Sequence, residues 1–212
     1  LWSPDGRSVA FLRLPGDLDG YPPSLKDPLA PFSIWVGDPN TGVAHEIWKA
    51  DPGMGSQFYW LDAADQLFWS KDGRIAFAWE KNGWRNLWTV PAAGGAAAVD
   101  VTPGQFEVES AVESLDGTQL LYATNEDDIA RRHIWSVGFD AANPSALTSG
   151  KESQWYPTAL ARGSVAYVNA GWSDAPQVVV RDAAGKTISE GPQIAASLPA
   201  AAMVEPQLVT FK

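Results

Sequence analysis

The sequence contains no cysteine and only two histidines, and these absences exclude several kinds of site. Without cysteine, neither a disulfide bond nor a thiolate metal site can form. No apolar run approaches the roughly 20 residues that a membrane-spanning helix needs. Positive charge is also scarce, with 15 Lys and Arg against 25 Asp and Glu. The net charge of −10 argues against a nucleic-acid partner, because phosphate binding needs a surplus of basic side chains.

Glycine, proline and tryptophan are abundant instead, with 19, 16 and 11 residues respectively. Frequent glycine and proline imply many turns, and many aromatic side chains imply broad, flat surfaces to cover. No long segment shows convincing 3.6-residue periodicity. The composition therefore favours short antiparallel strands over helices, and we expect an all-β fold.

One pattern recurs four times, a turn around an Asp-Gly pair followed by an alternating apolar strand. The fourth copy is degenerate, and the turns centre on Gly6, Gly73, Gly117 and Gly163. The last three of these glycines are 44 and 46 residues apart. A second apolar landmark follows each turn, at residues 34–36, 87–90, 134–137 and 178–180. Four strands in roughly 40 to 50 residues, with an Asp-Gly turn in each repeat, are typical of one β-propeller blade.

These repeats predict an all-β partial β-propeller of about four four-stranded antiparallel blades across residues 1–212. The predicted blades lie at about 1–50, 66–102, 106–150 and 155–191, followed by a tail strand at 207–212. An all-β sandwich is the alternative, but the turn and the aromatic residue recur in the same phase. Three tryptophans are therefore expected to pack between blades, Trp69, Trp88 and Trp135.

Four stretches carry a family resemblance, and they lie at residues 80–88, 102–108, 125–135 and 205–211. They resemble the N-terminal propeller of the prolyl oligopeptidase superfamily (S9) of serine peptidases, especially its dipeptidyl peptidase IV-like branch. The first three are similar to an E-x-x-G-aromatic-Arg hairpin, a T-x-G-x-aromatic-E-V junction and an S-N-x-x-D…R-H-L-Y strand pair. The fourth resembles the segment that leads into an α/β-hydrolase domain.

The resemblance implies a propeller that covers a catalytic pocket and admits short peptides, with the nucleophile in a G-x-S-x-G elbow on another domain. No such elbow occurs here, and the nearest match, at 53–57, lacks the final glycine. His133 lies on a repeat strand, where a structural role is the better interpretation. We therefore expect no catalytic residue, cofactor or metal site in this chain, and no peptide hydrolysis by the chain alone. The adjacent glutamates that clamp the substrate amine in that branch are absent, which leaves dipeptidyl specificity open.

Two long loops extend the first repeat, at 15–31 and 51–65, and long loops on a regular scaffold often carry function. A tolerated surface insertion is an equally good interpretation of the first loop. In the second, Tyr59 and Trp60 would offer apolar contact to a substrate, and Asp62 would bind a peptide amine. The alternative is that Trp60 packs beneath its blade.

The sequence leaves two functions open. The first is the substrate-gating propeller of a serine peptidase, whose partners would be a peptide substrate and the α/β-hydrolase domain of the parent chain. The second is a non-enzymatic, TolB-like PD40 propeller that binds a protein partner. The flanks of an open arc of blades also predict self-association. The compartment stays open between the cytoplasm and the periplasm of a bacterium.

Overall fold

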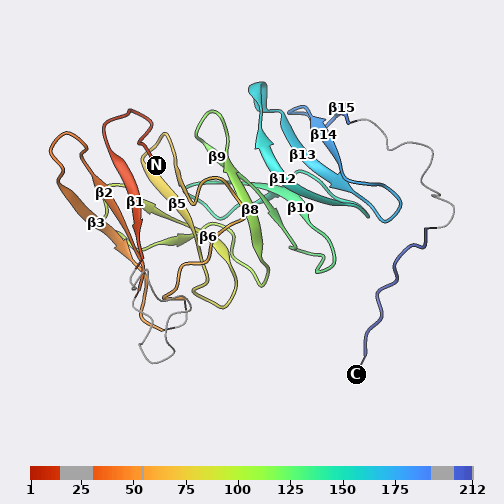
Figure 1. The fold of residues 1–212 in the computed structure, drawn as a ribbon, viewed down its shortest axis with the longest axis horizontal. Coiled ribbons are helices and arrows are strands. Elements are labelled where there is room, and N and C mark those ends of the chain that lie inside the picture. Colours follow the sequence, from red (N-terminus) through yellow and green to blue (C-terminus); the bar gives the residue numbers. More distant parts are fainter. Residues whose placement is uncertain (15–30, 54, 192–202, 212) are drawn as a thin grey trace, which may run out of the picture.

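The computed structural model describes residues 1–14, 31–53, 55–191 and 203–211. Within these residues the chain forms four antiparallel sheets that stand side by side in chain order (Figure 1). The one helical segment among them is a 3-10 turn at Ala161–Gly163, so no described helix is long and apolar enough to cross a membrane. The predicted all-β fold, a partial β-propeller, is confirmed.

The chain runs through the strands of each sheet in order. The first sheet contains β1 (Val9–Arg13), β2 (Ser33–Gly37) and β3 (Ala44–Lys49). The second contains β4 (Leu67–Trp69), β5 (Arg74–Trp79), β6 (Asn86–Pro91) and β7 (Val99–Asp100). The third contains β8 (Val108–Glu113), β9 (Gln119–Thr124), β10 (His133–Gly138) and β11 (Ser145–Ala146). The fourth contains β12 (Ser153–Ala159), β13 (Val165–Ala170), β14 (Gln177–Arg181) and β15 (Thr187–Glu190).

The first sheet has three named strands, yet the chain start occupies the place of a fourth. Trp2 forms an isolated antiparallel bridge with Val9. The amino group of Leu1 donates to the carbonyl oxygen of Ala10 at 2.9 Å, and the amide of Ala10 donates back at 2.8 Å. The innermost edge of β1 is therefore paired over this short stretch.

The recurring turns adopt one geometry in the first three copies. Each central glycine has a positive φ, which glycine adopts without steric cost, and these angles are 69° at Gly6, 79° at Gly73 and 68° at Gly117. Each glycine amide donates to the carbonyl of the serine three residues earlier, which is Ser3, Ser70 or Ser114. The Gly73 and Gly117 turns join β4 to β5 and β8 to β9, and the Gly6 turn joins the short stretch at Trp2 to β1 in the same way, so all three lie at the same end of the blades.

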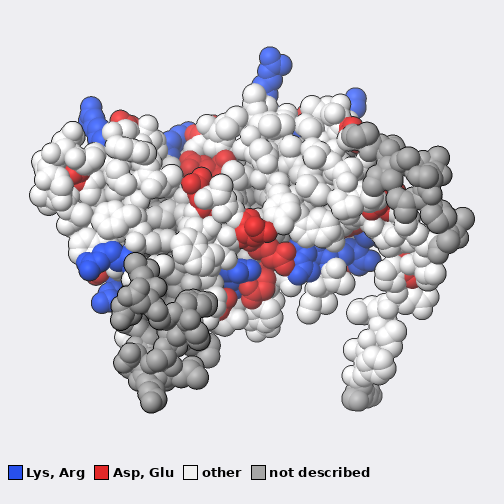
Figure 2. Space-filling model, in the orientation of Figure 1, with Lys and Arg blue, Asp and Glu red and all other residues white. Residues whose placement is uncertain are grey.

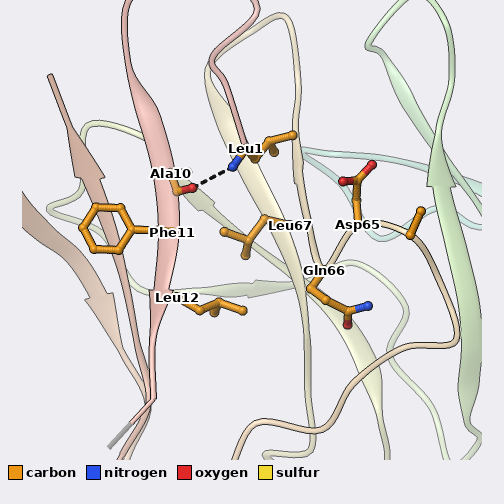
Figure 3. A pocket seen from close by; sticks show the side chains of 8 residues that line it. Leu1, Ala10, Phe11, Leu12, Asp65, Gln66 and Leu67 are labelled. Carbon is orange, nitrogen blue, oxygen red and sulfur yellow. Dashed lines mark hydrogen bonds between the residues drawn. The ribbon is translucent and has the colours of Figure 1, made fainter. Parts of the chain in front are cut away.

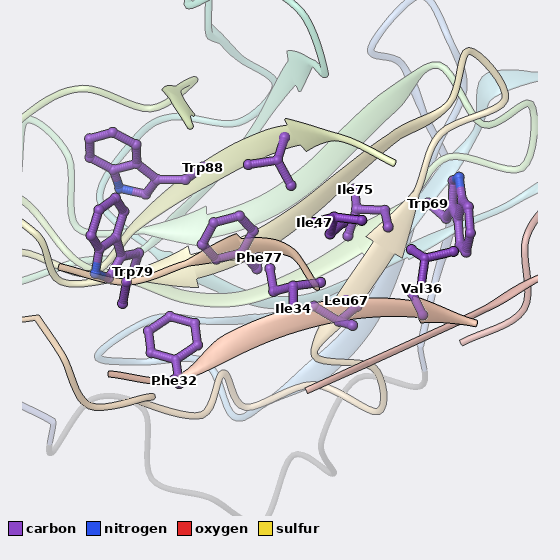
Figure 4. Packing of buried hydrophobic residues seen from close by; sticks show 13 residues of the cluster. Phe32, Ile34, Val36, Ile47, Leu67, Trp69, Ile75, Phe77, Trp79 and Trp88 are labelled. Atoms are coloured by element: carbon purple, nitrogen blue, oxygen red, sulfur yellow. The ribbon is translucent and has the colours of Figure 1, made fainter. Parts of the chain in front are cut away.

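Aromatic side chains fill the interface between the first and second sheets, as Figure 4 shows. Phe77 is fully buried there, and its ring centroid lies 4.6 Å from that of Trp48. Trp69 and Trp88 are also buried in this cluster, so their predicted packing role is confirmed. Since the rings meet mainly edge to face, their quadrupoles add to the apolar burial.

The next two interfaces differ in how much apolar surface they bury. The second and third sheets bury residues such as Leu87 and Tyr122, and Trp135 packs against them as predicted. The third and fourth sheets share a cluster of only four buried apolar residues, which are Ala123, Ile134, Tyr167 and Val179. The fourth sheet is therefore attached with much less buried hydrocarbon.

The outer face of the first sheet carries exposed aromatic surface. Phe11 stacks on Trp35 with ring centroids 6.5 Å apart, and the guanidinium of Arg13 lies 4.7 Å from the Trp35 ring centroid. Phe11 is more than one-third exposed. Self-association through this face stays a prediction.

The predicted tail strand is wrong for the residues that the structure describes, because no strand occurs in 203–211. Leu208 and Phe211 are almost fully exposed, so the alternation of apolar side chains there has no sheet edge to pair with. The long loop predicted at 15–31 lies outside the described residues except for Pro31.

Candidate functional site

The loop at 51–65 is held against the second sheet by a buried hydrogen bond. The indole Nε1 of Trp79 donates to the carbonyl oxygen of Gly55 at 2.7 Å. Gly55 has a φ of 82°, and a Cβ at this position would come within 2.9 Å of the carbonyl oxygen of Glu80. A side chain is therefore excluded where the loop approaches the β5–β6 hairpin.

Trp60 stands at the exposed end of an aromatic stack. Phe58 makes edge-to-face contact with buried Phe32 and with Trp60, with centroids 5.2 Å apart in both pairs. Trp60 nevertheless remains 59% exposed, so it does not pack beneath its blade. Tyr59 is also exposed, and its hydroxyl donates to Oε1 of Gln57 at 3.0 Å.

Asp62 connects the loop to the third and fourth sheets. Its amide donates to the carbonyl oxygen of Glu109 on β8 at 2.8 Å. Its carboxylate Oδ2 accepts a hydrogen bond of 2.9 Å from the hydroxyl of Tyr156 on β12. Among the described hydrogen bonds, none joins Tyr59 to Trp60 or Asp62, so Tyr59 stands apart from this connection.

A shallow hollow of about 210 Å³ opens nearby, between β1 and the start of β4 at Leu67 (Figure 3). Its wall includes Gln66, whose side chain is already fully engaged. The amide oxygen of Gln66 accepts from the amide of Leu61 at 2.8 Å, and its Nε2 donates to the carbonyls of Leu61 and Ala63 at 3.0 and 3.1 Å. Gln66 therefore fixes the backbone on either side of Asp62.

Two ion pairs lie beside Asp62. Arg132 donates through Nη2 and Nε to one oxygen of Glu109, at 2.6 and 2.8 Å. Arg85 lies 3.6 Å from Glu107 and donates to the carbonyls of Val108 and Trp60, at 2.8 and 3.2 Å. Both guanidinium groups are thus fixed by several contacts each.

We call five residues the charged cluster: Asp62, Arg85, Glu107, Glu109 and Arg132. Three carboxylates face two guanidinium groups, which leaves one negative charge in excess. Acidic side chains gather near the middle of the face shown in Figure 2, with basic side chains beside them. Burial and the neighbouring charge of Glu107 raise the pKa of Glu80 at the edge of this cluster, while Arg85 lowers it.

The topology explains why these residues meet. In an antiparallel sheet, the start of the first strand, the end of the second and the start of the third lie at one end. The cluster and its neighbours come from these positions in the second and third sheets, with Trp60 and Asp62 before β4, Arg85 before β6, Glu107 and Glu109 around the start of β8, and Arg132 before β10. The site therefore lies at the opposite end of the blades from the recurring Asp-Gly turns.

A family model named "Dipeptidyl peptidase IV (DPP IV) N-terminal region" matches residues 35–174. The chain belongs to this family. The match covers the second and third sheets, the first two strands of the fourth sheet and the charged cluster. It confirms the resemblance that the repeat stretches predicted.

Solved structures share the fold of this DPP IV N-terminal region. Puromycin hydrolase superimposes with a TM-score of 0.69 at 18% identity, over 99% of this chain and 31% of that chain. Dipeptidyl peptidase 4 of Porphyromonas gingivalis gives 0.62 at 13% identity, over 94% and 37%. A putative TolB from Agrobacterium tumefaciens gives 0.57 at 18% identity, over 91% and 65%. The chain thus spans less than two-thirds of each of these structures. No curated protein matches it.

Three of the family-like stretches converge in the charged cluster. Arg85 belongs to the 80–88 stretch, Glu107 to the 102–108 stretch and Arg132 to the 125–135 stretch. The ion pair between Arg85 and Glu107 joins the first two stretches directly. These motif residues therefore build the wall behind Asp62, a role that their spacing in the sequence alone does not show.

Sequence reasoning missed Tyr156, which contacts Asp62 across a separation of 94 residues. Its position in β12 coincides with a register shift between Trp155 and Thr158, and no local motif marks such a bulge. His133 lies elsewhere, in a buried contact between its Nδ1 and Oε1 of Gln154 at 2.7 Å, as expected for a structural residue. Among the described residues, no three His, Asp or Glu side chains come together as metal ligands.

Proposed function

We propose that this propeller forms the substrate-facing wall of a serine peptidase that acts on short peptides. The catalytic serine, in a G-x-S-x-G elbow, would lie on an α/β-hydrolase domain of the parent chain. In this proposal the propeller contributes no reacting group. It admits peptides by size and holds one end of the substrate near the hydrolase domain.

The observation that carries the proposal is the pairing of an exposed tryptophan with a carboxylate that faces no cation. Among the described ion pairs, Glu107 and Glu109 each face an arginine, whereas Asp62 faces none. A peptide ammonium would form a charge-assisted hydrogen bond with Asp62, and the Trp60 ring would offer apolar or cation–π contact.

A kinetic comparison in the parent enzyme tests this function. Asp62→Asn and Trp60→Ala should each raise KM for a free-amine dipeptidyl substrate, by about tenfold for Asp62→Asn, with kcat little changed. Asp72→Asn is the matched control, because it removes the same charge from an exposed turn at the opposite end of the second sheet. Unchanged kinetics in both site variants would remove Asp62 and Trp60 from the substrate wall.

The second candidate is a non-enzymatic propeller that binds a protein partner. The likeness to TolB structures supports it, since one of them is covered over 65% of its length. The coding sequence after Lys212 distinguishes the two functions. A domain with G-x-S-x-G would support the peptidase, and a stop codon would support the binding module.

A further inference from the structure

Tyr156 has a backbone conformation that tyrosine rarely adopts. Its φ is 54°, in the left-handed region, and it lies at the register shift in β12. The following residue is Pro157, which further restricts the conformations open to the residue before it. Strained residues of this kind persist only when other interactions compensate, and they concentrate at functional sites.

The strand pairs on both sides of Tyr156, which holds its backbone in place, but its side chain is half exposed and adds little packing. Its one described side-chain hydrogen bond is the 2.9 Å contact from the hydroxyl to Asp62. That bond raises the pKa of Tyr156, as expected for a phenol that donates to a carboxylate. A hydrogen bond between exposed groups contributes little net free energy, since water competes for both partners. The contact is therefore suited to exchange.

The charge around Asp62 indicates what would replace the hydroxyl. The other two carboxylates of the charged cluster are neutralised by Arg85 and Arg132. Asp62 forms no ion pair among the described residues, and its carboxylate accepts only from the neutral hydroxyl of Tyr156. An ammonium group would make a stronger, charge-assisted bond in the same place. Trp60 is exposed, makes edge-to-face contact with Phe58 and precedes Asp62 by two residues, so its ring is available to a ligand from the same loop.

We propose that Tyr156 is a displaceable cap on Asp62, and that a primary ammonium group of a peptide binds by taking the place of the Tyr156 hydroxyl. This inference rests on the proposed function and adds a competition that tunes affinity at the same site. Tyr156 belongs to the fourth sheet, and Asp62 to the loop before the second sheet. Binding of the ammonium group therefore also breaks the hydrogen bond that joins these two parts of the chain.

Calorimetric titration of the full chain with alanyl-alanine amide and its N-acetylated form tests the cap. Tyr156→Phe should bind the free-amine peptide about three- to tenfold more tightly than the unsubstituted chain, because the competing donor is lost. Asp62→Asn should bind it more weakly, and neither should respond to the acetylated peptide. Tyr122→Phe is the control, since it removes a buried hydroxyl that has no partner among the described residues.

The outcomes separate the cap from the site beneath it. If Asp62→Asn weakens binding but Tyr156→Phe does not strengthen it, the cap is refuted and the Asp62 site stands. If Asp62→Asn binds as the unsubstituted chain does, the amine site itself is refuted, and the cap with it. Should Tyr156→Phe fold poorly, Tyr156→Asn supplies the same loss of the hydroxyl in a residue that tolerates positive φ.

Discussion

The interface between the first and second sheets is aromatic, whereas that between the third and fourth is largely polar. The first buries Phe32, Phe77 and their neighbours in an edge-to-face array. At the interface between the third and fourth sheets, Gln154 links buried His133 to Asn169 through contacts of 2.7 and 2.8 Å. Hydrocarbon burial scales with area and needs no partner, but each buried polar group depends on its hydrogen bonds. The same fold is thus held by two different kinds of interaction along one chain.

This difference matters for the site, because the charged cluster lies on the second and third sheets, between the aromatic interface and the polar one. Asp62 and Arg85 belong to the second sheet and its preceding loop, and Glu109 to the third. Tyr156 belongs to the fourth sheet, whose interface with the third buries fewer apolar residues. We therefore expect the fourth sheet to open locally before the wall that the second and third sheets form.

The largest expected effect comes from breaking the aromatic interface. Phe77→Ala removes a fully buried ring between Phe32 and Trp48 and should lower the free energy of unfolding by about 3–5 kcal/mol. Chemical denaturation followed by tryptophan fluorescence measures this loss. A change below about 1 kcal/mol would show that the interface repacks and does not hold the sheets together.

A smaller effect is expected from breaking the polar interface. Gln154→Leu leaves Nδ1 of His133 and Oδ1 of Asn169 without their described partner, at a cost of about 1–3 kcal/mol. Hydrogen exchange should show lost protection in β13 and β14 before β5 and β6. Equal loss in all four strands would mean that the fourth sheet does not open separately.

The smallest effect concerns charge beside these interfaces. Lys81 lies over the rings of Trp79 and Trp88, which belong to the interface between the first and second sheets. Glu126 follows Tyr122, a residue of the interface between the second and third sheets, by four positions, and one of its oxygens is buried without a described partner. Burial, and then the charge of Asp127, raise the pKa of Glu126 to about 7.

The sign of the resulting pH dependence follows from this shift. The folded chain keeps the Glu126 proton up to about pH 7, but the unfolded chain releases it near the ordinary value of 4.5. Stability should therefore fall as pH rises between these values. Glu126→Gln should reduce this fall in Tm without abolishing it, because burial also raises the pKa of Glu113 to about 7. An unchanged pH profile would contradict the assignment to Glu126.

The fold was predictable because the repeats are local. Short segments are enough to show the Asp-Gly turns, the alternating apolar strands and the spacing of Trp88 and Trp135. These features together predicted the sheets. The tail strand was wrong because a short segment of sequence does not show whether a strand lies beside it in space to pair with. Trp60 and Asp62 could be proposed from sequence as loop residues of suitable chemistry, and their role stays a prediction.

The remainder of the site depends on contacts that no local pattern encodes. Tyr156 reaches Asp62 through a bulge, and Glu109 meets Arg132 across 23 residues. Both contacts arise from how neighbouring blades pack, so the sequence revealed the motif residues but not their convergence.

The central claim is that Trp60 and Asp62 form a site for a peptide amine, and an NMR titration of the isotope-labelled chain tests it most directly. With alanyl-alanine amide, the Trp60 indole signal and the backbone amides of Asp62 and Tyr156 should shift together. The N-acetylated peptide should leave them in place, because it carries no ammonium group. Equal shifts with both peptides, or shifts confined to other parts of the chain, would contradict the account.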